Sequence, residues 1–168
     1  VTQMAAYRPP SAGREGRLRL DFNENTVGCS PRVVRLLRGR LSRDRLATYP
    51  EYDSYRARMA AAFGRAAEEP QLTNGTDEAI QLALNTFVDA GERVIVSEPT
   101  FAMYRFYASL AGAEVVEVAP GDDLVFPVEA VRQEVRLSGA RAIFIANPNN
   151  PTGTAVAPEA IASLAAEF

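Results

Sequence analysis

The chain has 168 residues, 47% of them hydrophobic, and a formal net charge of −3 at pH 7. This length suffices for one ordinary domain with a core, and the acidic balance argues against nucleic acid or an anionic membrane as a partner. No apolar run approaches the ~20 residues that cross a bilayer, and residues 1–10 lack the basic region and apolar core of a secretory signal. The single Cys29 cannot form an internal disulfide, so we expect a cytoplasmic protein.

The first third of the chain predicts an arm, a polar loop and two helices. Residues 1–16 have no periodicity and are expected to form a mobile arm. Leu18, Leu20 and Phe22 alternate with polar residues, which predicts a strand or extended segment entering the loop 23–25. Helices are predicted over 30–46, with Ser30 as a candidate cap, and over 54–67. The first of these carries many arginines, which we interpret as a solvated face and not as a nucleic-acid surface.

A glycine turn that opens a helix comes next. Leu72 belongs to a short apolar stretch, Asn74-Gly75-Thr76-Asp77 forms the turn, and the helical pattern runs over 78–88. Backbone N–H groups at the start of a helix point outward at the positive end of its dipole, so this turn is a candidate phosphate site. The alternative is an ordinary helix start without a ligand.

The remaining chain alternates short β-rich runs with helical patterns. Strands are predicted at 93–97, at 114–118 and from residue 140, and helices at 102–111, 128–135 and 158–168. Together with the stretch at Leu72 this gives about four short strands that alternate with helices. Such alternation predicts an α/β fold with a parallel sheet.

The last predicted strand leads into the turn Asn147-Pro148-Asn149-Asn150-Pro151-Thr152-Gly153. Two prolines fix φ, Gly153 allows a φ that other residues resist, and asparagine side chains can bond their own backbone. Ligands of open α/β sheets bind at the carboxyl ends of the strands, where this turn is expected. The alternative is a rigid turn with no ligand.

Four segments occur in the order of a known family: LDFNEN, NGTDE, EPTF and NPNNPTG. Over 18–168 the chain resembles the N-terminal portion of class I/II aminotransferases that use pyridoxal 5'-phosphate (PLP), of the histidinol-phosphate aminotransferase type. The resemblance implies an incomplete three-layer parallel-sheet sandwich, the major domain of the aspartate-aminotransferase-like fold (fold type I). Residues 1–47 would be the arm and part of the small domain, and 48–168 the N-terminal part of the large PLP-binding domain.

The resemblance also implies roles for individual residues. Gly75, Thr76 and Asp77 would hold the PLP phosphate, Phe101 would stack on the cofactor ring, and Asn150 would donate a hydrogen bond to the ring oxygen. Tyr49 would reach the cofactor phosphate of a partner protomer, and Asn25 would lie near the substrate. The alternative for Phe101, Tyr104 and Tyr107 is core packing, which we accept for Tyr107 and leave undecided for Tyr104. The alternative for Tyr49 is an aromatic anchor beneath the following helix, and for Asn25 a polar turn after an extended segment.

The implied activity is transfer of an amino group between glutamate and a histidinol-phosphate-like or aromatic keto substrate, in a homodimer and without a metal. All eighteen basic residues are arginine, with neither lysine nor histidine in the sequence. The family binds its cofactor through a Schiff-base lysine, so we expect these 168 residues to be inactive alone. Two alternatives stay open: an enzyme like threonine-phosphate decarboxylase, and a non-catalytic truncated product.

Overall fold

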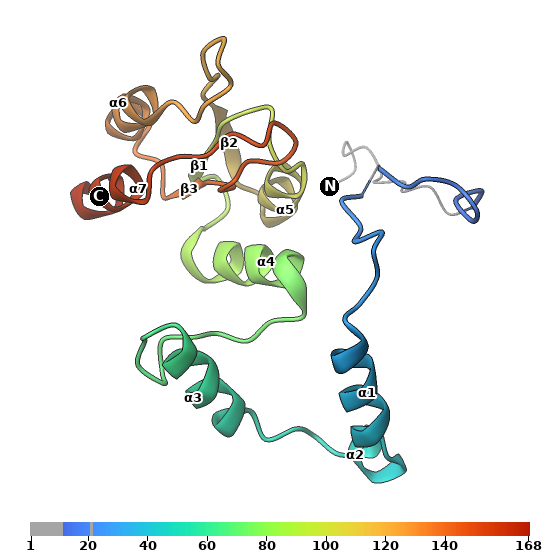
Figure 1. Cartoon of the computed structure of the whole chain (residues 1–168). Helices are drawn as coiled ribbons and strands as arrows, with labels where there is room; N and C mark the ends of the chain where they lie inside the picture. The colour runs from blue at the N-terminus through green and yellow to red at the C-terminus, as the bar shows by residue number, and fades with distance from the viewer. Residues whose placement is uncertain (1–11, 21) are drawn as a thin grey trace. The chain divides into compact units, whose positions relative to one another are not determined.

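The computed structural model describes residues 12–20 and 22–168, which fall into two compact units (Figure 1). We call Thr73–Phe168 the sheet unit and Ala5–Leu72 the helical unit. The arm predicted over 1–16 lies mostly outside the described residues. This division at residue 72 separates the two sets of residues that make most of their contacts among themselves. The assignment of 1–47 and 48–168 to small and large domains stays a prediction.

The sheet unit contains three parallel strands. They are β1 (Arg93–Val96), β2 (Glu114–Glu117) and β3 (Ala142–Phe144), in the order β2-β1-β3. In the register, Val94 lies between Val115 and Ala142. Four helices accompany the strands: α4 (Gly75–Phe87), α5 (Met103–Ala111), α6 (Val128–Ser138) and α7 (Pro158–Glu167). The predicted α/β class with a parallel sheet is confirmed.

The central strand β1 divides the core into two clusters. Side chains alternate across a strand, so Val94 and Val96 point to one face of the sheet and Ile95 to the other. Val94 and Val96 pack with buried residues of α4 and α5, whereas Ile95 packs with α6 and with Leu164 of α7. All three β1 residues are fully buried. The sheet therefore lies between two helical layers, as predicted (Figure 1).

On the side away from β1, β3 has no strand partner among the described residues. A groove of about 420 Å³ runs beside this strand, with Ile143, Ile161 and Leu164 among its lining residues. Within the described residues β3 pairs only with β1. This exposed edge agrees with the expectation of an incomplete sheet.

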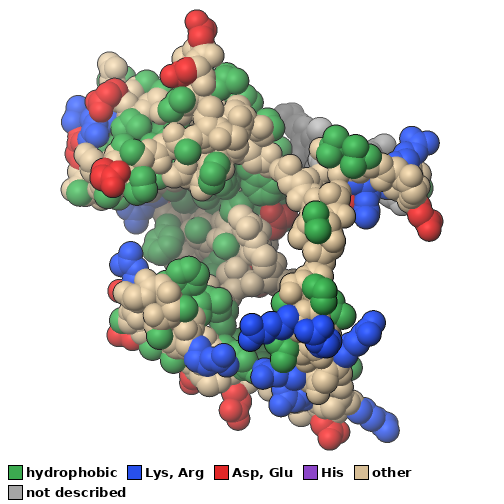
Figure 2. All heavy atoms as spheres, in the orientation of Figure 1, with side chains coloured by type: hydrophobic (Ala, Val, Ile, Leu, Met, Phe, Trp, Pro, Cys, Tyr) green, Lys and Arg blue, Asp and Glu red, His purple; other side chains and the backbone are tan. Residues whose placement is uncertain are grey.

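The helical unit contains α1 (Pro31–Arg40), α2 (Arg43–Ala47) and α3 (Tyr52–Ala62). The single helix predicted over 30–46 is wrong, because the chain breaks at Leu41 and Ser42 and the Ser42 hydroxyl accepts a hydrogen bond from the Arg45 N–H at 3.2 Å. Ser30 lies at the start of α1 without making a side-chain cap. Exposed arginines gather over α1 and α2 (Figure 2).

Two predicted extended segments do not form strands. The backbone at 18–20 and at Leu72 pairs with no strand among the described residues. Leu18 and Leu20 are 77% and 79% exposed, so their alternation does not correspond to a buried face. Short strands are stable only when hydrogen-bonded to neighbours, which a local pattern cannot supply. Among the described helices, none combines the length and apolar character of a membrane span.

Candidate functional site

The first part of the candidate site is the start of α4. Gly75 has φ 83°, a left-handed conformation that side-chain-bearing residues resist, and it begins the helix. The Asn74 side chain makes no cap bond, while its backbone N–H is bound by the Glu78 carboxylate. Thr76 is exposed. The first-turn N–H groups are thus not capped by the Asn74 side chain, and the helix dipole favours an anion there.

The carboxylate of Asp77 would repel an anion bound at that turn, and it interacts with a phenol of the next helix. Asp77 is half-buried and interacts with the phenol of Tyr107 on α5. Burial raises the pKa of Tyr107, and the charge of Asp77 and its hydrogen bonding to the phenol raise it further. This contact joins the first turn of α4 to α5. Tyr107 also packs against the α4–α5 core cluster, as predicted.

The second part is the loop between β1 and α5, which carries Phe101. Phe101 is half-buried and meets Tyr104 edge to face, with ring centroids 5.7 Å apart. Tyr104 is buried and stacks on Phe144 of β3 at 5.1 Å, and burial raises the pKa of its phenol. Tyr104 is therefore a core residue. Phe101 combines core packing on one side with partial exposure, and its stacking on a ligand stays a prediction.

The start of this loop is held by an arginine of α5. Arg105 Nε donates to Glu98 at 3.1 Å, and another of its guanidinium nitrogens donates to Glu117 of β2 at 2.8 Å. One side chain thereby connects the loop, α5 and the neighbouring strand. These groups are partly exposed, so the pairs contribute more to local geometry than to overall stability.

The third part is the turn after β3, which its asparagines hold closed. The Asn147 side-chain amide donates to the Val156 carbonyl at 2.9 Å, and its oxygen accepts from the Val156 N–H at 3.0 Å. The Gly153 N–H donates to the Asn149 carbonyl at 2.8 Å, and Gly153 has φ 74°. The peptide bonds before Pro148 and Pro151 are cis, as is the bond before Pro99. The predicted turn is confirmed, and its rigidity stays a prediction.

The structure brings the second and third parts into contact through Asn149. Its side chain accepts a hydrogen bond from Thr100 and donates one to the Pro99 carbonyl. Sequence reasoning singled out Asn150 in this turn and missed Asn149. The pair of adjacent asparagines was the available signal, but the sequence does not indicate which of the two bonds Thr100, 49 residues away.

Two interactions therefore link the segments that carry the predicted residues. Asp77, next to Thr76, meets Tyr107 in the helix that follows Phe101, and Thr100, next to Phe101, bonds Asn149, next to Asn150. β1 and β3 are adjacent, so their carboxyl ends lie at one edge of the sheet, where open α/β folds bind ligands. That Thr76, Phe101 and Asn150 contact one molecule together stays a prediction.

Two predicted residues belong to the helical unit. Tyr49 is 99% exposed, so the alternative of a buried aromatic anchor does not hold. The Asn25 amide closes its own loop, donating to the Gly28 carbonyl and accepting from the Val27 N–H, both at 3.1 Å. The polar-turn interpretation of Asn25 is confirmed, and its contact with a substrate stays a prediction.

The family model for aminotransferase class I and II matches residues 15–167. The chain belongs to this aminotransferase family. A histidinol-phosphate aminotransferase of Symbiobacterium thermophilum is 39% identical over 148 residues, which cover 86% of this chain and 40% of that protein. One from Erythrobacter litoralis is 37% identical over 164 residues, covering 95% and 43%. The chain thus spans less than half the length of these curated relatives.

Solved aminotransferase structures have the same fold. A putative histidinol-phosphate aminotransferase from Erwinia carotovora atroseptica superposes with a TM-score of 0.82 and 26% identity, covering 96% of this chain and 46% of that one. The histidinol-phosphate aminotransferase of Sinorhizobium meliloti, solved with pyridoxal-5'-phosphate, gives 0.77 and 22%, covering 88% and 40%. The likeness to the latter supports the fold. The predicted fold type I architecture is confirmed.

Proposed function

We propose that the chain is part of a PLP-dependent aminotransferase and that its sheet unit supplies the phosphate-binding and ring-binding side of the cofactor site. The observation that carries this proposal is the family match over 15–167. The contacts between the loops at the carboxyl ends of β1 and β3 support it, because they bring the predicted ring-binding residues toward one edge of the sheet.

The residues at the start of α4 fit a phosphate. Gly75 has a positive φ, Thr76 is exposed with a hydroxyl donor, and the Asn74 side chain does not occupy the first-turn N–H groups. The phenol of Tyr107 interacts with the Asp77 carboxylate, and such a neutral donor partly offsets the repulsion that a phosphate would otherwise meet. Gly75, Thr76 and Asp77 would therefore bind the phosphate mainly through backbone amides.

The ring would be bound by Phe101 and Asn150. A half-buried aromatic side chain offers a flat apolar face that is fixed on one side by Tyr104. Asn150 would donate its amide N–H to the ring oxygen and so orient the ring. Bound PLP supplies an electron sink for the carbon that loses its proton, whereas the protein binds and orients the reactants.

The substrate and the assembly are the finer parts of the proposal. The relatives described above are histidinol-phosphate aminotransferases, which favours glutamate and a histidinol-phosphate-like or aromatic keto partner over a decarboxylase reaction. We assign Asn25 to the substrate side. Tyr49 is almost fully exposed, as expected of a residue that reaches a second protomer in a homodimer. The exposed free thiol of Cys29 is compatible with the cytoplasm.

Because the sequence contains no lysine, we propose that these 168 residues bind the cofactor without a covalent bond and do not catalyse transamination alone. Incubation with PLP followed by borohydride should fix no cofactor on any internal residue. Peptide mapping that found a specific internal adduct would overturn this part of the proposal. The α-amino group at the N-terminus serves as the internal reference for nonspecific labelling.

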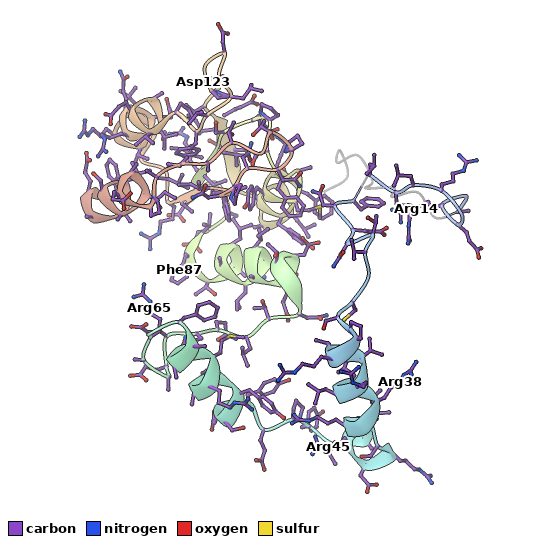
Figure 3. All side chains as sticks on the ribbon, viewed as in Figure 1. Arg14, Arg38, Arg45, Arg65, Phe87 and Asp123 are labelled. Atoms are coloured by element: carbon purple, nitrogen blue, oxygen red, sulfur yellow. The ribbon has the colours of Figure 1, made fainter. Side chains whose placement is uncertain are left out.

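Binding of the cofactor site is tested with pyridoxamine 5'-phosphate, which has no aldehyde and reports noncovalent affinity through its ring fluorescence. Phe101→Ala should weaken binding about two- to twelvefold, since an aromatic stack contributes ~0.5–1.5 kcal/mol. Gly75→Ala should weaken it at least as much, because the change distorts the phosphate-binding turn. Phe87→Ala is the matched control: this ring is 61% exposed at the end of α4 (Figure 3). Equal affinities in all four proteins would refute the proposed site.

A further inference from the structure

We propose that Asn149 is a positioning residue, whose side chain sets the loop that carries Phe101 against the turn that carries Asn150. This inference rests on the proposed cofactor site and adds a residue that contacts neither substrate nor cofactor. The two residues predicted to bind the ring, Phe101 and Asn150, directly follow Thr100 and Asn149, which are hydrogen-bonded to each other. The position of the Asn149 side chain therefore affects the positions of both.

The Asn149 side chain uses its hydrogen-bonding capacity in three directions. Its amide oxygen accepts from the Thr100 hydroxyl at 2.7 Å, and its amide nitrogen donates to the Pro99 carbonyl and to the Thr152 hydroxyl, both at 2.9 Å. The two amide hydrogens are therefore both used. The chemically similar aspartate could accept from Thr100 but could not donate to Pro99.

These bonds belong to a directional chain of hydroxyl groups. The Thr154 hydroxyl donates to the Leu124 carbonyl at 2.8 Å, so its proton is committed there. The Thr152 hydroxyl must then donate to Thr154 across their 2.7 Å contact, and it accepts from Asn149. Hydrogen bonds that share donors and acceptors in one direction strengthen one another. Asn149 is the member of this chain that continues it into the loop after β1.

Asn149 and Asn147 differ in how far along the sequence their hydrogen-bond partners lie. Asn147 bonds Val156 within the same turn, nine residues away, and thus closes the turn itself. The partners of Asn149 on the other loop are 49 and 50 residues away in the sequence. Asn147 therefore shapes one loop, whereas Asn149 fixes the relative position of two.

The consequence for the site is a matter of proximity. Phe101 follows Thr100 directly, and Asn150 follows Asn149 directly, so a single peptide bond separates each predicted ring contact from the hydrogen bond between the loops. Loss of this bond would let the aromatic ring and the amide move independently. Binding of the ring would weaken, because both contacts must be in place at the same time. Binding of a phosphate at α4 would not change.

The first test measures coupling between the loops without any ligand. Amide hydrogen exchange is followed at Tyr104 N–H, which donates to the Phe101 carbonyl at 3.1 Å, and at Gly153 N–H, which donates to the Asn149 carbonyl at 2.8 Å. Asn149→Asp and Thr100→Val should accelerate exchange at both amides. Thr100→Ser keeps the hydroxyl and should behave as wild type. Asn147→Asp should accelerate exchange at Gly153 alone.

The second test measures binding to the 168-residue chain. Asn149→Asp and Thr100→Val should weaken the affinity for pyridoxamine 5'-phosphate about tenfold. Both should leave the affinity for inorganic phosphate unchanged. Thr100→Ser should bind pyridoxamine 5'-phosphate with wild-type affinity. The role of Asn149 is overturned if Asn149→Asp and Thr100→Val accelerate hydrogen exchange at Gly153 only. It is also overturned if both variants bind pyridoxamine 5'-phosphate as wild type does while Phe101→Ala weakens this binding. Equal affinity in wild type, Phe101→Ala and Gly75→Ala refutes the proposed function instead, and hydrogen exchange still decides whether Asn149 couples the loops.

Discussion

The sheet unit and the helical unit both contain α-helices of 10 or 11 residues, yet among the described residues only the sheet unit buries a core. In the sheet unit, Val94, Ile95 and Val96 of β1 are completely inaccessible and helices cover both faces. In the helical unit, Ala60 is the one buried hydrophobic residue among those described, and Leu36, Leu37 and Leu41 are more than half exposed. Local hydrogen bonds define the helices of both units, whereas burial requires a second surface, which the parallel sheet provides in the sheet unit.

The same difference separates the predicted site residues. Those in the sheet unit are fixed by neighbours, as Phe101 is by Tyr104 and Asp77 by Tyr107. In the helical unit Tyr49 projects from an exposed segment, and Arg38 and Arg45 extend from α1 and α2 (Figure 3). Preorganisation of a site therefore follows the core. We expect the sheet unit to retain its part of the site when the helical unit is perturbed.

The largest expected difference between the units lies in their leucines. Leu84 of α4 is fully buried, so Leu84→Ala should lower the free energy of unfolding by about 2–5 kcal/mol through lost burial and the cavity that remains. Leu36 of α1 is 51% exposed, and Leu36→Ala should change it by less than about 0.5 kcal/mol. Urea unfolding followed by the near-ultraviolet circular dichroism of the tyrosines measures both. A comparable loss for Leu36→Ala would show that α1 has a packing partner.

A second comparison uses two helical glycines with opposite expected signs. Gly75 begins α4 at φ 83°, so Gly75→Ala should destabilise the sheet unit by about 1–2 kcal/mol. Gly39 lies within α1, with nothing within 4 Å of an added Cβ, and Gly39→Ala should favour that helix by about 0.8–1 kcal/mol. Helicity by circular dichroism and urea midpoints report the two effects. If both changes were destabilising, α1 would be more tightly packed than its exposure indicates.

The smallest expected effect concerns pH and the contact between α4 and α5. The pKa of Tyr107 is raised above its ordinary value of 10.0, mainly by burial and then by Asp77, so the folded chain favours the protonated phenol. This contribution to stability is complete below the unfolded pKa and is lost as pH rises through the folded pKa. Between about pH 8 and about pH 11 the urea midpoint should fall less in Tyr107→Phe than in wild type.

Tyr49→Phe is the matched control in the helical unit, because that ring is 99% exposed. This variant removes a phenol without removing a packed side chain. Tyr104, whose pKa burial also raises, is present in all three proteins and contributes the same fall to each. Identical pH profiles for wild type and Tyr107→Phe would mean that Asp77 and Tyr107 do not interact in solution.

Local patterns predicted most elements of the sheet unit, with ends shifted by a few residues. They failed where a partner was needed: Leu18 and Leu20 alternate as a strand would, but no strand lies beside them. They also failed where a competing cap was overlooked, since Ser42 starts a new helix within the segment predicted to be one. In the site, residue type was informative for Gly75, because the turn needs the positive φ that glycine adopts readily. For Asn149 it was not, because asparagine is equally suited to a turn, a cap or a ligand.

The sequence by itself determined the family, the order of the motifs, the glycine turn that opens α4 and the absence of a lysine that could hold a cofactor covalently. These depend on residue identity and on neighbours within a few positions. The tertiary structure alone decided that Tyr107 meets Asp77, that Tyr104 is a core residue and that Asn149 joins two loops. Such contacts connect residues 30 to 50 positions apart, and only the pairing of β1 with β3 and the packing of α4 on α5 bring them together.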